Sequence, residues 1–208
     1  MADFFVRYFH VLFGIVWIGM LYYFNFVQTE YFKEAEADAK KDAMAKLAPR
    51  ALWWFRWGAM FTFLTGLYLL HAVGVDIMAM EPARGYILVG ALAGTFMFLN
   101  VWLIIWPNQQ VVLGMKEGDG PSSAAKAGLA SRTNTLFSGP MLLGMLASAG
   151  HAGMVNGTAT GLYAALALVV LLEANALFGK QGPMTTVRGV IVSSLVLTAV
   201  IFALLNHL

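Results

Sequence analysis

Long apolar segments alternate with shorter polar ones along almost the whole chain. Most of the six apolar segments approach the roughly 20 residues that a helix needs to cross about 30 Å of hydrocarbon. A backbone exposed to lipid must satisfy its own hydrogen bonds, and these segments lack strand-like alternation, so helices are expected. The pattern predicts an all-α integral membrane protein with about six transmembrane helices. They form a single transmembrane helical domain over residues 1–208, with spans at residues 4–27, 54–73, 86–106, 135–149, 162–178 and 190–205.

The polar connections carry most of the cations. Eleven of the thirteen Lys and Arg residues fall in or beside the first, third and fifth connections, which leaves only Arg7 and Arg84 for the opposite face. Because cytoplasmic loops are enriched in Lys and Arg, these connections are expected inside and both termini extracytoplasmic. The predicted location is the bacterial inner (cytoplasmic) membrane, in a multi-pass arrangement, with the first segment retained and not cleaved as a signal peptide.

The composition agrees with a membrane protein and limits the kinds of metal or cofactor site that the chain can form. Hydrophobic residues make up 60% of the chain, and a net charge of +2 is too small to indicate a nucleic-acid partner, so the expected surroundings are the lipid bilayer. Residues 31–47 are expected to extend the first helix to a turn at Pro49, and residues 114–123 to form a flexible loop. The absence of cysteine excludes thiolate metal sites, iron–sulfur clusters and covalently attached haem in this sequence.

The histidines all lie at the ends of apolar segments, on the face predicted to be outside: His10, His71, His151 and His207. An imidazole in apolar surroundings is costly without a partner, and paired histidines from different helices can hold a b-type haem. We therefore predict that His10 and His151 ligate the haem iron, and that Gly14 and Gly150 leave room for the macrocycle.

His71 is a further candidate ligand. For His71 and His207, an unliganded histidine near the membrane interface is the ordinary alternative. A copper site that uses Met145 or Met154 is the weaker alternative to haem b, because methionines in so apolar a chain mostly serve packing.

A different set of polar residues lies toward the predicted inner face: Arg56, Arg132, Asn134 and Glu173. Guanidinium groups beside aromatic rings and amides suit a planar anionic small molecule or a quinone headgroup. The alternative is an interfacial belt of tryptophans with snorkelling arginines. A carboxyl as deep as Glu173 should be neutral or paired with an arginine, and it is the candidate for handling protons.

Three stretches resemble the membrane domain of bacterial urate hydroxylases, in which an N-terminal membrane region precedes a cytochrome c domain. They are FHVLFGIVWIGMLYYFNF at residues 9–26, WWFRWGAMFTFLTGLYLL at 53–70 and SRTNTLFSGPMLLGMLASAGHAGM at 131–154. The similarity extends in order along most of the chain. The pairing of W-F-R-W with a later S-R-x-N-T is more specific than the first-helix pattern, which also resembles bacterial protoporphyrinogen oxidase.

The resemblance implies oxidation of urate to 5-hydroxyisourate, with electrons leaving through cytochrome c. The family's first-helix histidine maps to His10, and its histidine after the SRxNT helix maps to His151. No C-x-x-C-H motif occurs in the 208 residues, so the acceptor is expected to be a separate cytochrome c. Two alternatives stay open: a non-enzymatic accessory or electron-transfer subunit of a larger membrane redox complex, and a protoporphyrinogen-oxidase-like haem-handling protein.

Overall fold

The computed structural model describes residues 1–148 and 158–208, and within these ranges the chain is helical with no strand. The first long helix runs through α1 (Ala2–Tyr22), the π-helical turn η1 (Tyr23–Gln28) and α2 (Thr29–Glu34). The second runs through α3 (Ala37–Asp42), the π-helical turn η2 (Ala43–Leu47) and α4 (Ala48–Ala72). The two are separated only by Ala35 and Glu36.

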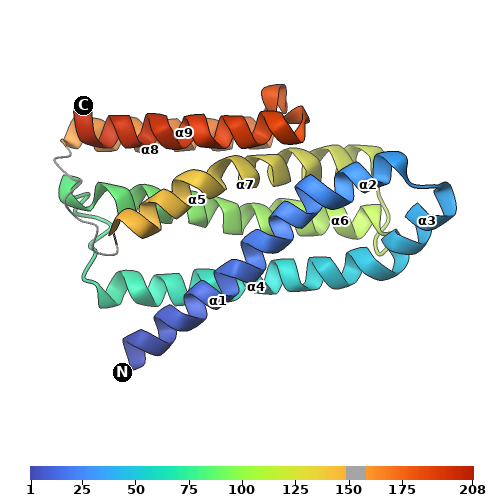
Figure 1. Ribbon diagram of the computed structural model, residues 1–208, viewed down its shortest axis with the longest axis horizontal. Helices are drawn as coiled ribbons and strands as arrows, with labels where there is room; N and C mark the ends of the chain where they lie inside the picture. Colours follow the sequence, from blue (N-terminus) through green and yellow to red (C-terminus); the bar gives the residue numbers. More distant parts are fainter. Residues whose placement is uncertain (149–157) are drawn as a thin grey trace.

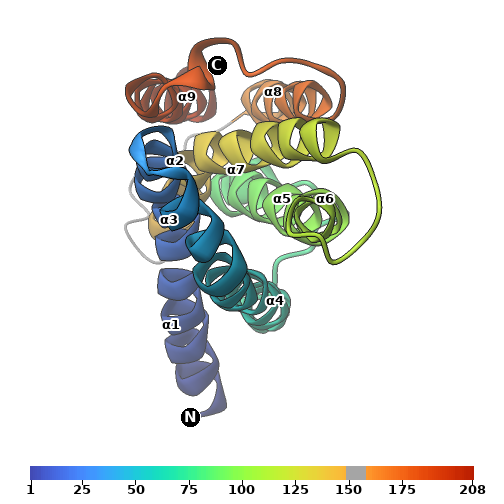
Figure 2. The ribbon, with the colours of Figure 1, turned by 90° about the vertical axis from the view of Figure 1, so that its right-hand side faces the viewer.

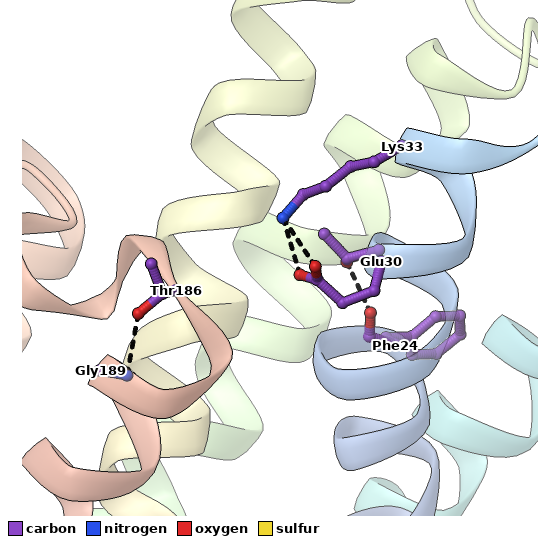
Figure 3. A network of polar contacts seen from close by, with 6 residues as sticks. Phe24, Glu30, Lys33, Thr186 and Gly189 are labelled. Carbon is purple, nitrogen blue, oxygen red and sulfur yellow. Dashed lines mark hydrogen bonds and ion pairs between the residues drawn. The ribbon is translucent and has the colours of Figure 1, made fainter.

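The third long helix joins a 3₁₀ turn η3 (Pro82–Arg84), α5 (Gly85–Leu99), the π-helical turn η4 (Asn100–Ile105) and α6 (Trp106–Val112). It is followed by α7 (Gly120–Ser148), α8 (Ala159–Phe178), the 3₁₀ turn η5 (Gly182–Thr185) and α9 (Val187–His207). Threonine hydroxyls cap the last two helices. Thr158 Oγ1 accepts the N–H of Gly161 at 3.1 Å, and Thr186 Oγ1 accepts that of Gly189 at 2.9 Å (Figure 3).

As far as they are described, the predicted apolar segments lie within these long helices to within a residue, so the all-α prediction is confirmed for the described residues. Four helices are long and apolar enough to cross a membrane: Ala2–Glu34, Pro82–Val112, Ala159–Phe178 and Val187–His207. The remaining two, residues 37–72 and α7, contain more polar residues.

Two local predictions were wrong. The first connection turns at Ala35 and Glu36, not at Pro49, because the second long helix continues through Pro49, directly after the π turn η2. The helix α7 begins at Gly120, inside the stretch predicted as a loop and well before residue 135. Its first half is rich in alanine, a strong helix former, and the buried stretch that begins at Arg132 is covered by neighbouring helices, so it needs no apolar run.

The helices form three layers, seen in both views (Figures 1 and 2): α1 with α4, then α5, α6 and α7, then α8 with α9. The helix α7 contacts α5, α6, α8 and α9, and residues 132–138 are all buried. Its closest neighbour is α5: a Cβ added at Gly144 would lie 2.6 Å from the Cα of Gly90. Only glycine permits this approach, which fixes the axial position of α7 against α5.

Both chain ends lie at the same end of the bundle (Figure 1). The C-terminal end of α4 is also there, whereas the connections α2–α3, α6–α7 and α8–α9 lie toward the opposite end. We refer to these as the terminal end and the connection end.

Candidate functional site

His10 is anchored to α4 through one ring nitrogen. Its Nδ1 lies 2.9 Å from the carbonyl oxygen of Thr62 and 3.0 Å from Oγ1 of Thr65. A carbonyl can only accept, and the Thr65 hydroxyl already donates to the Phe61 carbonyl at 2.6 Å. Both contacts therefore require the proton on Nδ1. The lone pair of Nε2 is then free, which is the arrangement typical of a histidine that ligates a metal.

Two glycines determine the space around this imidazole. A Cβ at Gly66 would lie 3.1 Å from Cε1 of His10, so Gly66 allows the ring to approach α4 closely. A Cβ at Gly14 would meet its nearest atom, in Thr62, only at 3.9 Å. Gly14 therefore faces Thr62 of α4 at ordinary contact distance, and its predicted role beside a macrocycle stays a prediction.

The other predicted ligands are less informative. His151 and Gly150, with Met154, lie outside the described residues, so their predicted roles stay predictions. His71 and His207 are exposed, at the ends of α4 and α9. Among residues 1–148 and 158–208, no group of three or more His, Asp or Glu side chains is placed to hold a metal ion.

A buried chain of amide and carboxyl groups connects α7, η4 and α8. Asn100 donates through Nδ2 to Oδ1 of Asn134 at 2.9 Å and to Oε2 of Glu173 at 3.1 Å. Asn134 in turn donates to the carbonyl of Met97 at 2.9 Å. Asn134, Asn100 and Glu173 are 0%, 1% and 7% exposed. Asn100, a polar residue of the third apolar segment, thus holds two of the predicted site residues together.

The π-helical turns lie beside this polar region. The turn η4 begins at Asn100, and the N–H of Trp106 after it bonds to the carbonyl of Val101, five residues back. The turn η1 carries Asn25, whose Nδ2 donates to Oγ of Ser131 on α7 at 2.8 Å. Single π turns inside α-helices are frequent at functional sites. Nothing in the sequence pattern distinguishes a π turn from a continuing α-helix.

Arg56 stacks on an aromatic ring. Its Cζ lies 3.7 Å from the centroid of the Trp106 ring, a close cation–π contact between α4 and α6. Its Nη1 is buried and has no hydrogen-bond partner among the described residues. One face of the guanidinium is therefore occupied by Trp106, and part of its hydrogen-bonding edge is unused.

Arg132 is only 5% exposed, and its Nη1 is also buried without a partner in the described part of the chain. Both oxygens of the nearby carboxylate Glu30 accept bonds from Lys33, at 2.8 and 2.9 Å (Figure 3). Arg132 and Asn134 are two positions apart on α7, so their side chains leave the helix on nearly opposite sides.

The structure therefore divides the predicted inner site into parts. Asn134 and Glu173 are brought together, Arg56 lies against Trp106, and Arg132 points from another side of α7. The expected pairing of Glu173 with an arginine is not found: the two ion pairs among the described residues are Lys33–Glu30 and Lys46–Asp42. Sequence separation could not reveal this, because the pairing depends on which face of each helix meets its neighbour.

The interfacial belt is partly present. Trp53 and Trp54 are 45% and 57% exposed near the start of α4, as expected of belt residues. Trp57 differs, because its ring packs against Trp102 with centroids 5.6 Å apart. The belt alternative thus fits the first two tryptophans and does not account for Arg56 and Trp106.

The family described as urate oxidase N-terminal matches residues 76–205. The matched part includes Arg132, Asn134 and Glu173, whereas His10 and Arg56 precede it. No curated protein and no solved structure matches the chain.

Proposed function

The chain belongs to the urate oxidase N-terminal family, and on this basis we propose that it is a membrane oxidoreductase component that oxidises urate. The reaction joins urate and water to give 5-hydroxyisourate, two protons and two electrons. The electrons pass to a separate cytochrome c, each molecule of which accepts one. The setting is the bacterial inner membrane, crossed about six times, with both termini extracytoplasmic.

The observation that carries the proposal is a pair of guanidinium groups that form no ion pair with a described residue. Arg56 and Arg132 form no ion pair with any described carboxylate, and each has a buried Nη1 without a partner. A buried charge without a partner is strongly destabilising, so a bound anion would relieve a cost already present in the fold. Urate is planar and carries one negative charge near neutral pH.

The two arginines would contribute differently. The ring of Trp106 holds the Arg56 guanidinium flat, so its edge is oriented before the anion arrives. Arg132 would bind another part of the anion, and bidentate guanidinium contacts would orient a planar ligand. Because Arg132 and Asn134 leave α7 on opposite sides, we assign Arg132 to the anion and Asn134 to the group around Glu173.

Glu173 is the proton-handling residue in this proposal. Asn100 donates to only one carboxyl oxygen, Oε2, so the group has an oxygen free to take or release a proton. Asn134 keeps Asn100 in place by accepting from the same amide nitrogen. Hydroxylation of urate releases two protons, and a carboxyl inside the bundle can accept one of them.

We further propose that His10 and His151 hold a b-type haem at the terminal end. His10 fits this group, because its Nδ1 is held by α4 and its Nε2 carries a free lone pair. Bound there, a haem would supply one-electron transfer toward cytochrome c. The protein's contribution is to fix the imidazole tautomer through Thr62 and Thr65.

The test is urate-dependent reduction of added soluble cytochrome c by membranes that contain this chain. Arg56→Lys and Arg132→Lys retain charge but lose the planar fork, so each should lower kcat/KM roughly ten-fold or more. Arg188→Lys is the matched control, since Arg188 is exposed at the start of α9. Its rate should stay close to that of the unchanged chain.

A chain that shows no urate-dependent reduction with any supplied cytochrome, and that copurifies tightly with a membrane redox complex, would contradict the proposal. That result would favour the accessory-subunit alternative. Equal losses in all three lysine variants would contradict the assigned roles of Arg56 and Arg132.

A further inference from the structure

A groove lies between α1 and α4 near the connection end, away from the polar groups of the proposed urate site. The two helices cross and then diverge toward this end (Figure 1). The groove has a volume of about 420 Å³ and is lined by Met20, Tyr23, Leu47, Arg50, Ala51 and Trp54. Ala51 is buried, and its small side chain leaves the hollow between the larger neighbours.

The surface of the groove is apolar, and Arg50 lines it through the aliphatic part of its side chain, with the exposed guanidinium at the margin. Leu47 and Trp54 are exposed on the walls, where lipid tails would surround them. Arg50 is the charged lining residue. One of its nitrogens, Nη1, donates to the carbonyl of Lys46 at 3.1 Å, which leaves most of its five N–H groups available.

The charge of Arg50 is not compensated locally. The neighbouring Lys46 forms an ion pair with Asp42, whereas Arg50 has no ion-pair partner among the described residues. An apolar groove that ends at a free guanidinium is complementary to an amphiphile with an acyl chain and an anionic head. Basic pockets between transmembrane helices on the cytoplasmic side are known to bind such headgroups.

We propose that this groove is a binding site for one anionic phospholipid. An acyl chain lies along Met20, Ala51 and Trp54, and the phosphate binds the guanidinium of Arg50. The site is independent of the urate proposal, and it would make the α1–α4 pair sensitive to lipid composition.

The experiment is native mass spectrometry of the detergent-purified protein, titrated with phosphatidylglycerol or phosphatidylcholine. We expect one tightly bound phosphatidylglycerol and weaker binding of phosphatidylcholine. Arg50→Gln should weaken phosphatidylglycerol binding about five-fold, since one basic residue near an anionic surface contributes about that factor. Lys116→Gln removes the same charge at the same end without touching the groove, and it should change binding less than two-fold.

A second variant tests the apolar part of the groove, where the acyl chain would lie. Ala51→Leu fills the groove without changing charge, so it should also reduce phosphatidylglycerol binding, with helicity checked by circular dichroism. Three results would overturn the proposal. These are equal losses in Arg50→Gln and Lys116→Gln, which would show diffuse attraction only; equal binding of both lipids; and a dimer mass that disappears in Ala51→Leu, which would show that a second copy occupies the groove.

Discussion

Replacing Asn100 with leucine is the most informative single change in the buried polar chain. Leucine has a similar size but no donor, so the variant loses both bonds from Nδ2, at 2.9 Å to Asn134 and 3.1 Å to Glu173. The acceptors Oδ1 of Asn134 and Oε2 of Glu173 stay buried. The opposing gain is that the Oδ1 of Asn100, buried without a described partner, is removed with the amide.

The expected loss of stability follows from the two lost hydrogen bonds and the removed amide oxygen. Side-chain hydrogen bonds between membrane helices average about 0.6 kcal/mol, with a maximum near 1.7 kcal/mol. Leaving a buried acceptor without a donor costs about 1–3 kcal/mol when the surroundings cannot adjust. Two lost bonds, partly offset by removal of the unpaired Oδ1, give a destabilisation of about 1–3 kcal/mol for Asn100→Leu.

The assay is reversible unfolding in mixed micelles, followed by circular dichroism. The control is Asn108→Leu in the same long helix, because Asn108 is half-buried and bonds only to the carbonyl of Ile104 in its own helix, at 2.8 Å. This control should cost less than about 0.5 kcal/mol. If the two variants unfold alike, the bonds from Asn100 contribute nothing to stability and the reasoning fails.

The remaining predictions concern the haem, the packing and the topology. His10→Ala should abolish or convert a low-spin b-type spectrum of the reduced protein while His71→Ala leaves it nearly unchanged; a colourless protein from haem-replete cells would refute haem binding. Gly144→Ala should lower the free energy of unfolding by about 1–3 kcal/mol, because the added Cβ would meet backbone atoms of α5. The control Gly94→Ala makes only ordinary contact at 3.6 Å and should cost far less. Equal unfolding midpoints for the two variants would contradict the close approach of α7 to α5. Cysteines placed at Ser122 and at the N-terminus should react with an impermeant reagent from opposite sides of the membrane, and labelling of both from one side would overturn the topology.

The helices were predictable from the sequence because the apolar segments are long and uninterrupted. Hydropathy alone located α8 and α9 to within a few residues. The same argument failed for α7, whose first half contains Arg132 and Asn134. A helix that other helices cover does not need an apolar sequence, and hydropathy reports only contact with lipid.

The sequence predicted which residues belong to the candidate site, and it did not predict which of them contact one another. Polar side chains in apolar segments identified Glu173 and Asn134, and the same signal is present at Asn100. Their grouping depends on the rotation of each helix about its axis. The π turn at Asn100 changes that rotation, so a regular helical wheel could not have given the contacts of Trp106 with Arg56.

The burial of residues 132–138 of α7 on all sides has a consequence for how the chain is made. A segment with Arg132 and Asn134 has little tendency to leave the translocon for lipid by itself, since a central arginine costs about 2.5 kcal/mol or more on the insertion scale. Its place between α5 and α9 supplies protein surroundings in place of lipid. Biogenesis must therefore deliver α7 together with helices already present, so that ribosomes which stop soon after residue 148 should leave this segment poorly inserted.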